Sequence, residues 1–231
     1  MRKPFPYRVT CPLWTPSGKS VVENSSLRIR PAVDSDSWIC AELTNTAADG
    51  MFADLFGNRW QSIVSQLSKQ PGHSMSLEHV RVLDQDGEVV GMAAAMTGLD
   101  AKKGFDSQLW NVAGWRTIRA LVMSLALRPM FRFLDFHEPD EFYLQALATR
   151  ASRRGQGLGT RLLNDVNERG MAAGSHRLAL HVDKSNVNAQ RLYDRYGFSY
   201  ESISTPALFA GGERIERWVK SLPDGRETTD G

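Results

Sequence analysis

Hydrophobic and polar residues alternate in several short runs near the start of the chain, and this period of two predicts β-strands. Leu27-Arg28-Ile29-Arg30 is the first run, and Pro31 follows it. Leu77–Leu83 and Val89–Met96 form two more, joined by the polar turn Asp84-Gln85-Asp86-Gly87. Two such runs around a short glycine-containing turn are typical of a β-hairpin.

Between the first strand and this hairpin, apolar residues recur at helical spacing. A helix is predicted after Asp34–Asp36, whose side chains are of the kind that caps helix N-termini, and it carries Trp38 and Leu43. A second helix is predicted over Arg59–Leu67 and ends before Pro71-Gly72. Two helices therefore separate the first strand from the hairpin.

The clearest strand of the second half begins at Glu141. Its period of two places four apolar side chains on one face, namely Phe142, Leu144, Ala146 and Ala148. The opposite face carries Glu141, Tyr143 and Gln145. An apolar face and a more polar face are thus predicted for this strand.

A glycine-rich loop and a helix that ends near Gly170–Gly174 follow this strand. A further strand is predicted over Leu178–Val182, then a short helix over Asn186–Tyr196 that Gly197 closes. Residues 199–220 predict a final hairpin. The order of elements predicts an α/β (α+β) fold class, with helices packed on a mixed sheet.

Three segments flank or interrupt this domain, which is predicted over residues 27–220. Residues 1–26 read as a Pro-rich N-terminal arm and residues 221–231 as a polar tail. Residues 98–136 read as a helical insertion or lid, with an apolar helix face formed by Ile118, Leu121, Val122 and Leu125. With Trp110, Trp115 and several basic residues, the insertion is expected to wall a substrate site. A structural helix with a solvated basic face, or a dimer interface, is the alternative.

The composition is that of an ordinary globular protein. The 231 residues are 42% hydrophobic and 23% charged, and 28 Lys and Arg against 26 Asp and Glu leave a net charge of +2. This balance predicts no nucleic-acid partner and no membrane partner. Cys11 and Cys40 are the two cysteines, residues 1–20 lack a secretion signal, and Leu121–Leu127 is far shorter than the about 20 residues that cross a bilayer. We therefore expect a reduced, cytoplasmic protein.

The loop Arg153-Arg154-Gly155-Gln156-Gly157-Leu158-Gly159-Thr160 lies between a strand and a helix, which is the layout of an anion site. Glycines let backbone N–H groups turn toward one point, and the helix N-terminus adds partial positive charge. The spacing excludes a Rossmann fingerprint, because Thr160 stands where the third glycine is required. It also differs from a Walker loop; Gly18-Lys19-Ser20 matches only the end of that motif, with Leu13 in place of its first glycine.

Two motifs carry a resemblance to a known family. Arg154-x-x-Gly157-x-Gly159 after a strand resembles the acyl-CoA loop of the GNAT family of N-acetyltransferases. Asn186-x-x-Ala189-x-x-Leu192-Tyr193-x-x-x-Gly197-Phe198 is similar to that family's second signature, with Arg195 in the place of a lysine. The resemblance covers about residues 27–220 and implies a mixed, mostly antiparallel sheet that is splayed between strands 4 and 5, with helices on both faces.

The resemblance implies that acetyl-CoA binds as a cosubstrate. Its pantetheine arm is expected between the fourth and fifth strands, against the bulged fourth strand at Leu147, Ala148 and Thr149. Its pyrophosphate is expected on the amides of Arg154, Gly155, Gln156, Gly157, Leu158, Gly159 and Thr160. Asn186 matches an asparagine beside the pantetheine arm, although asparagine at this point also suits a helix N-cap.

Tyr193 matches a tyrosine near the thioester sulfur, which implies a general acid that protonates the departing CoA thiolate. The acceptor amine must first lose a proton, because an alkylammonium with a pKa near 10.4 is only about 0.04% neutral at pH 7. Relatives often carry the base at the positions of Tyr143 and Gln145, which cannot serve at pH 7. Glu141 shares their face and is the candidate base, acting through a water. Further candidates in the preceding turn are His137, Glu138 and Asp140.

The residues and the resemblance together predict an acetyl-CoA-dependent N-acetyltransferase in which an amine attacks the thioester directly. No metal site is expected, because the five histidines show no zinc-type pairing with cysteines; His181 is expected in the core or the cleft wall. A small-molecule amine is the first acceptor to consider and a protein or peptide amine the second. A CoA-binding sensor or interaction module without transfer activity is the alternative, another acyl group is a third interpretation, and the resemblance leaves homodimerisation open.

Overall fold

The computed structural model describes residues 27–104, 106–114, 132–205 and 214–223. Its strands form one seven-stranded sheet in the order β1-β2-β3-β4-β5-β7-β6. The strands are β1 (Leu27–Pro31), β2 (Val80–Gln85), β3 (Glu88–Thr97), β4 (Glu141–Thr149), β5 (Arg177–Asp183), β6 (Ser199–Ile203) and β7 (Ile215–Ser221). Neighbouring strands are antiparallel except β4 and β5, which are parallel. The mixed, mostly antiparallel sheet that the resemblance implied is therefore confirmed.

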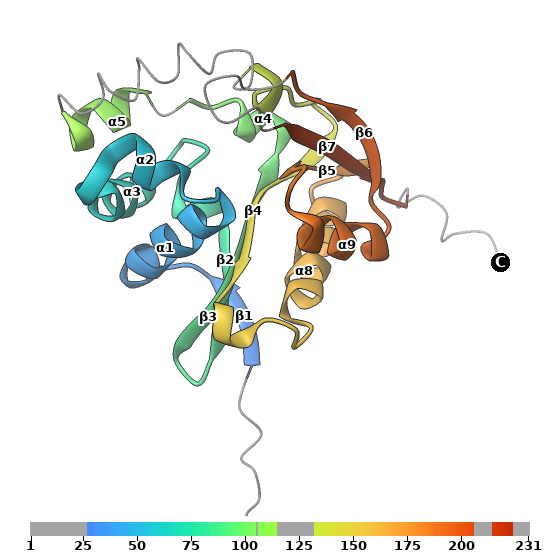
Figure 1. The fold of residues 1–231 in the computed structure, drawn as a ribbon, viewed down its shortest axis with the longest axis horizontal. Coiled ribbons are helices and arrows are strands. Elements are labelled where there is room, and N and C mark those ends of the chain that lie inside the picture. Colours follow the sequence, from blue (N-terminus) through green and yellow to red (C-terminus); the bar gives the residue numbers. More distant parts are fainter. Residues whose placement is uncertain (1–26, 105, 115–131, 206–213, 224–231) are drawn as a thin grey trace, which may run out of the picture.

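Helices cover both faces of this sheet (Figure 1). They are α1 (Ser37–Ala47), α2 (Met51–Phe56), α3 (Trp60–Ser68), α4 (Gly98–Ala101), α5 (Asp106–Ala113), α8 (Leu158–Ala172) and α9 (Val187–Tyr196). Short 3-10 turns lie at Asp34–Asp36, Gly57–Arg59, Leu77–His79 and Ala151–Arg153. The α1–α3 group lies on one side of the strand layer, and α8 and α9 lie on the other. No helix of the described residues is long and apolar enough to cross a membrane.

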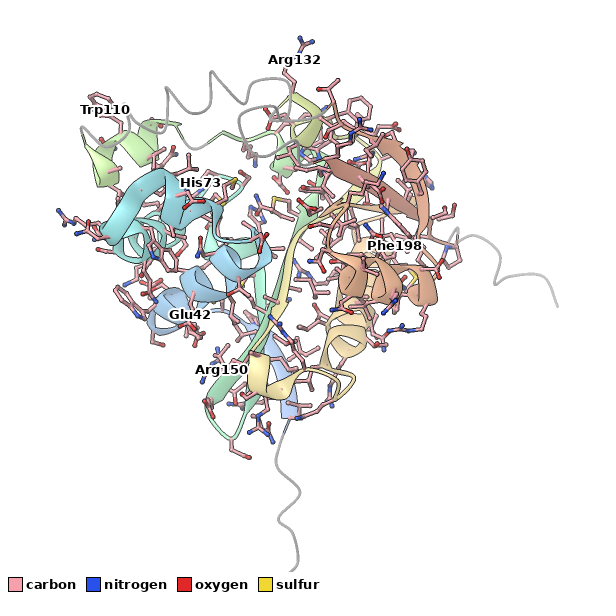
Figure 2. All side chains as sticks on the ribbon, in the orientation of Figure 1. Glu42, His73, Trp110, Arg132, Arg150 and Phe198 are labelled. Carbon is pink, nitrogen blue, oxygen red and sulfur yellow. The ribbon has the colours of Figure 1, made fainter. Side chains whose placement is uncertain are left out.

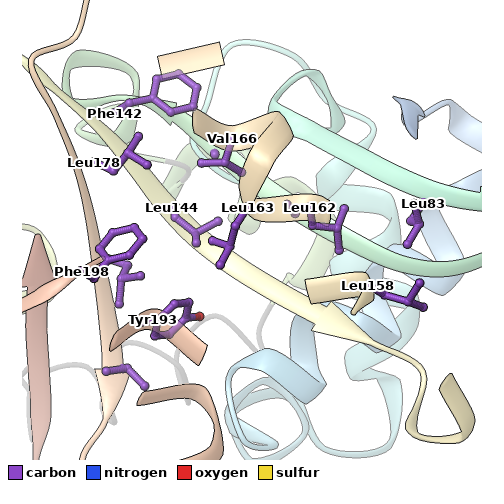
Figure 3. Packing of buried hydrophobic residues seen from close by; sticks show 14 of the residues in the cluster. Leu83, Phe142, Leu144, Leu158, Leu162, Leu163, Val166, Leu178, Tyr193 and Phe198 are labelled. Carbon is purple, nitrogen blue, oxygen red and sulfur yellow. The ribbon is translucent and has the colours of Figure 1, made fainter. Parts of the chain in front are cut away.

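Each face of the sheet has its own hydrophobic core. On the α8 side, Leu162, Leu163 and Val166 of the helix are fully buried and pack with Leu144 and Tyr193 (Figure 3). On the α1 side, a second cluster is formed by Cys40, Leu43, Leu77, Val80, Val82, Val89, Met92, Ala94, Ala146 and Ala148. Each helix packs against its face of the sheet through the apolar stripe in its sequence.

The predicted apolar face of β4 is wrong beyond Leu144. The pairing with β3 shifts by one residue, so that Ala95 faces Leu144 while Ala94 faces Ala146, and Gln145 is the extra residue of a bulge. Phe142 and Leu144 therefore lie in the core beside α8, whereas Ala146 and Ala148 lie in the core beside α1. One inserted residue exchanges the two faces of a strand, because side chains alternate with a period of two.

The first four strands and the last three meet along a short ladder. The parallel pairing of β4 with β5 joins Glu141–Leu144 to Arg177–Leu180. No pairing between the two strands follows, although β4 continues to Thr149 and β5 to Asp183. The sheet therefore forks after Leu144, as the resemblance implied.

Other predicted elements lie close to their expected places. The hairpin turn at Asp86 and Gly87 has φ of 54° and 88°, the left-handed pair that a two-residue turn needs. Leu77–His79 is a 3-10 turn rather than the start of a strand, because the Ser76 hydroxyl accepts a hydrogen bond from the amide of Glu78. The short helix α2 was not expected, and α5 lies within the predicted helical insertion. The predicted arm over residues 1–26 and the insertion helix around Leu121 lie outside the described residues.

Candidate active site

The fork leaves one edge of β4 open. Leu147, Ala148 and Thr149 pair with Ala93, Met92 and Gly91 of β3, and no described strand pairs with their other edge. Leu147 packs toward the α8 core, and Ala148 is buried in the core on the α1 side. Peptide groups on the open edge are thus available to hydrogen-bond an extended ligand, as in strand addition.

The glycine-rich loop follows β4 and ends at the start of α8. Gly155 and Gly157 both have φ of 76°, a conformation that disfavours other residues, and Gly157 occupies the N-cap position of the helix. The segment from Arg154 to Gly157 is exposed. The first amides of the helix, which have no partner within it, therefore begin at an accessible loop, and this is an arrangement that binds anions.

Helix α9 lies directly beside this loop. A Cβ atom added at Gly159 would come within 3.0 Å of the Leu192 side chain, so glycine allows α8 and α9 to approach closely. Asn186 caps α9: its Oδ1 accepts a hydrogen bond of 3.1 Å from the amide of Ala189. Since only the oxygen of Asn186 is used in this bond, its amide N–H groups are still able to donate to a ligand.

Tyr193 projects from α9 into the core beside α8 (Figure 3). Its ring meets Phe198 edge-on at 5.7 Å, and only 7% of the residue is exposed. Burial raises the pKa of the Tyr193 phenol above its ordinary value, so the hydroxyl keeps its proton at neutral pH. Among the described residues no hydrogen-bond partner for this hydroxyl is found, which leaves the proton free to be donated.

The other face of the sheet at the fork carries a buried cluster of charges. Glu141 of β4 is fully buried, and Arg217 of β7 donates a hydrogen bond of 2.5 Å to it. Arg177 of β5 lies 3.6 Å from the same carboxylate, and Arg217 also binds Glu201 at 2.6 Å. Burial favours the neutral acid, but His137, whose Nδ1 lies 3.5 Å from the carboxylate, and the hydrogen bond from Arg217 hold the pKa of Glu141 below its ordinary value.

These contacts oppose the predicted role of Glu141 as a base. A carboxylate that is fixed between two guanidinium groups and has a lowered pKa is a weak proton acceptor. Two of the further candidates are also engaged: Glu138 is ion-paired with Arg177, and His137 is buried beside Glu141. The geometry instead assigns Glu141 to the connection between β4, β5 and β7.

A Tyr–His pair lies next to this cluster. The hydroxyl of Tyr143 is 3.1 Å from Nδ1 of His181, and the Tyr143 ring lies 4.2 Å from that of His137. His181 follows the last residue of β5 that pairs with β4, and its partner on β7 is Arg217. Burial, reinforced by the charge of Arg217, lowers the pKa of His181 to about 3. This histidine is therefore neutral at physiological pH.

Comparison with known proteins identifies the family. The model of the acetyltransferase (GNAT) family matches residues 37–198, which is more than half of the chain. The chain belongs to the GNAT acetyltransferase family. The match includes the fork, the glycine-rich loop and α9, and it ends at Phe198 just after that helix.

Individual GNAT proteins are only distantly similar. The uncharacterized N-acetyltransferase YdgE of Bacillus subtilis (strain 168) is 33% identical over 67 residues, and the match spans 29% of this chain but only 43% of that protein. An N-acetyltransferase from Staphylococcus aureus Mu50 shares the fold with a TM-score of 0.63 at 18% identity, over 83% of this chain and 99% of that one. The ribosomal-protein-S18-alanine N-acetyltransferase from Escherichia coli has a TM-score of 0.51 at 17% identity, over 89% and 99% of the two chains.

The structure of this GNAT domain brings the predicted site residues to the two sides of the fork. The loop residues, Asn186 and Tyr193 lie on the α8 side, and Glu141 and Tyr143 lie on the other. Sequence analysis missed Arg217, whose side chain is 1% exposed. Arg217 lies 76 positions from Glu141 in the sequence. It is an arginine in a strand next to the edge of the sheet, and the sequence around it shows no pattern that indicates burial. The described residues include no group of three or more metal-binding side chains.

Arg150 lies at the rim of the site, whereas Trp110 lies on a helix that packs elsewhere. Figure 2 shows Arg150 at the end of β4, beside the glycine-rich loop, where its guanidinium binds Glu88 at 2.6 Å. Trp110 lies on α5, within the predicted insertion, and is 56% exposed. Its exposure agrees with a wall that a ligand or partner covers, but α5 packs against α3 rather than over the fork.

Proposed function

We propose that this chain is an acetyl-CoA-dependent N-acetyltransferase that transfers an acetyl group to an amine by direct attack on the thioester. One observation carries the proposal: β4 separates from β5 after Leu144, and its open edge leads to an exposed, glycine-rich helix N-terminus. Acetyl-CoA has a narrow pantetheine arm that carries amide groups and ends in a pyrophosphate. The amide groups match the open strand edge, and the pyrophosphate matches the anion site.

The residues present fit the cosubstrate in three places. Amides between Arg154 and Thr160 would hold the pyrophosphate, and the exposed Arg154 side chain adds a positive charge beside them. The open edge at Leu147–Thr149 would hydrogen-bond the pantetheine amides. Asn186 would donate its free N–H groups to the same arm while its oxygen caps α9. When bound, the cosubstrate supplies an activated acetyl group.

Tyr193 is the proposed general acid. It lies on the α8 side of the fork, buried and protonated at neutral pH. An apolar setting disfavours a thiolate as well as a phenolate, so the leaving sulfur would take the proton from Tyr193 as the C–S bond breaks. The Tyr193 oxygen would then regain a proton through solvent before the next turnover.

The acceptor is proposed to be a small-molecule amine first and a protein or peptide amine second. The second class is supported by one structural neighbour, which is named as an N-acetyltransferase of an alanine in ribosomal protein S18. Both classes would approach from the face opposite α8, because the core around Tyr193 fills the other face.

Thermal unfolding with acetyl-CoA and with CoA tests the cofactor. A ligand at 100 times its dissociation constant adds about 2.7 kcal/mol of stability, which raises the Tm of a domain of this size by roughly 5–10 °C. A folded sample with no rise would contradict the proposal. Release of CoA in the presence of benzylamine, spermidine, kanamycin or a peptide with a free alanine N-terminus tests the transfer.

The role of Tyr193 is tested by Tyr193→Phe. We expect kcat to fall by roughly 10²–10³-fold with acetyl-CoA affinity unchanged, because the phenol acts only as sulfur departs. Tyr196→Phe is the matched control: its hydroxyl binds Asn164 at 2.9 Å, away from the fork. Binding of acetyl-CoA without CoA release for any amine would instead favour a non-catalytic CoA-binding module.

A further inference from the structure

His181 is placed at the fork, on the face opposite Tyr193. Leu180 and Val182, its neighbours along β5, lie in the core with Tyr193, so the side chain of His181 lies on the other face. Leu180 is the last residue of β5 that pairs with β4, which makes His181 the first residue beyond the ladder. A thioester held in the fork would therefore have Tyr193 on one side and His181 on the other.

The imidazole of His181 is held firmly but only through one nitrogen. Its Nδ1 lies 3.1 Å from the Tyr143 hydroxyl. The rings of Tyr143 and Phe133 lie 5.5 and 5.2 Å from its ring, and that of His137 lies at 6.3 Å. The other nitrogen, Nε2, is buried and has no hydrogen-bond partner among the described residues. Buried polar atoms in native proteins are nearly always paired, so this nitrogen is marked for a ligand.

The charges around His181 favour an uncharged ligand group. Arg217 is its cross-strand neighbour, and its positive charge opposes a second cation there. Glu141, the carboxylate whose charge acts on the imidazole, is already neutralised by Arg217 and Arg177. A neutral imidazole with a lone pair on Nε2 is a hydrogen-bond acceptor for N–H groups. An amine in its reactive, unprotonated form has such N–H groups and keeps its own lone pair free.

We propose that Nε2 of His181 binds the acceptor amine by accepting one of its N–H bonds, while Nδ1–H donates to the Tyr143 hydroxyl and fixes this tautomer. This inference rests on the proposed N-acetyltransferase function and defines its acceptor site. His181 orients the amine lone pair toward the fork, and it selects the neutral amine. Tyr143 is a positioning residue, because it acts only through His181.

The same geometry defines the class of acceptor. The aromatic rings of Phe133, His137 and Tyr143 surround the imidazole, and Glu141, the carboxylate whose charge acts on it, is paired with Arg217. A monoamine with an apolar or aromatic stem fits these surroundings. A polyamine or an aminoglycoside needs several carboxylates to offset its charge.

Histidine-ring ¹⁵N NMR on the wild-type protein with CoA bound tests the site without requiring turnover. CoA and benzylamine form an unreactive ternary complex, since no acetyl group is present. We expect the spectrum to show the Nδ1–H tautomer of His181 and a shift of its Nε2 signal as benzylamine is added at pH 9. The His181→Gln variant identifies the signal. An Nε2–H tautomer, or an Nε2 signal that benzylamine leaves unchanged, overturns the proposal.

Kinetics provide the second test. For the amine that the wild-type protein acetylates, His181→Ala is expected to raise KM about tenfold, the loss typical of one hydrogen bond to a buried group, with acetyl-CoA affinity unchanged. His181→Gln retains a hydrogen-bond acceptor, so its KM is expected to rise less than that of His181→Ala. Tyr143→Phe is likewise expected to raise KM by less than His181→Ala does. His176→Ala, at an exposed histidine just before β5, is the matched control. An unchanged KM in His181→Ala, or a preference for spermidine over benzylamine, contradicts the inference. Failure of the wild-type protein to bind acetyl-CoA instead refutes the function on which it rests.

Discussion

The carboxylate of Glu141 and the guanidinium of Arg217 meet at 2.5 Å, and both side chains are sealed from solvent. The contact joins β4 to β7 across β5, on the face that carries His181. A buried ion pair contributes little over an apolar pair of the same size, but losing one partner leaves an uncompensated charge. Mutation can therefore separate the energetic cost of burying these two charges from the role of the ion pair in joining β4 to β7.

Glu141→Gln is expected to lower the free energy of unfolding by about 2–3 kcal/mol, because Arg217 loses its buried counter-charge and retains an ion pair with the partly exposed Glu201. Urea unfolding measures this loss. Glu88→Gln is the control, since the Glu88–Arg150 pair has a similar distance of 2.6 Å at the surface, where such a pair is worth under about 1 kcal/mol. The double variant Glu141→Leu with Arg217→Met should recover most of the stability. An equally small effect of Glu141→Gln and Glu88→Gln would show that the buried pair is unimportant.

Gly157→Ala is expected to weaken acetyl-CoA binding severalfold and to destabilise the fold by about 1–2 kcal/mol, because its φ of 76° strains an L-residue. Gly174 provides a matched site, with φ of 71°, open space around its Cα, and a position at the opposite end of α8. Gly174→Ala should therefore lose similar stability with no change in affinity. Isothermal titration with acetyl-CoA and urea unfolding measure the two quantities. Equal affinities in the two variants would remove the loop from the binding site.

Asn186 combines a helix cap with a proposed ligand contact, and two substitutions separate them. Asn186→Ala removes the cap of α9 and should cost about 0.5–2 kcal/mol of stability. Asn186→Asp keeps an oxygen for the Ala189 amide but lacks the donating N–H groups. We expect Asn186→Asp to be as stable as the wild type and to bind acetyl-CoA more weakly. Wild-type affinity in Asn186→Asp would mean that the residue only caps the helix.

The buried His181 predicts acid sensitivity. Its pKa falls from 6.5 to about 3 on folding, so below pH 6.5 the unfolded chain binds a proton that the folded protein does not. Stability is lost as pH decreases through this window, by up to about 1.4 kcal/mol per pH unit. Glu141 does not contribute above its ordinary pKa of 4.5, because its stabilisation is lost only below that value. Urea unfolding at pH 6.5 and pH 5 should thus show a smaller loss in His181→Gln than in the wild type.

His73 and His79 also have pKa values lowered by burial, so part of the acid sensitivity is expected to remain in the variant. Their contribution is the same in both proteins and cancels in the comparison. Identical slopes for wild type and His181→Gln would show that the pKa of His181 is not lowered by folding.

The sequence predicts most of the fold because local signals and tertiary structure agree. Gly197 closes α9 at φ of 94°, and the Asp86-Gly87 turn connects β2 and β3 as expected. The face of β4 could not be predicted from alternation, since the bulge at Gln145 depends on how β3 pairs with the strand rather than on the residue itself. On the α8 side the site residues were predicted from local motifs, and on the other face Glu141 was predicted as a base without the arginine that binds it. The pairing of Glu141 with Arg217 joins residues 76 positions apart and leaves no periodic trace.

Four paired positions form the whole strand-to-strand contact between β1–β4 and β5–β7 in the described residues. These four paired positions form a seam between two parts of the sheet. A brief opening of the seam would separate the two parts, each of which keeps the strand pairing within it. Amide hydrogen exchange detects such sub-global unfolding. A cosubstrate in the fork would touch both parts and bind only when the seam is closed. It would therefore slow amide exchange in Glu141–Leu144 and Arg177–Leu180, the residues that pair across the seam, and a ligand of the reaction would contribute to the integrity of the sheet itself.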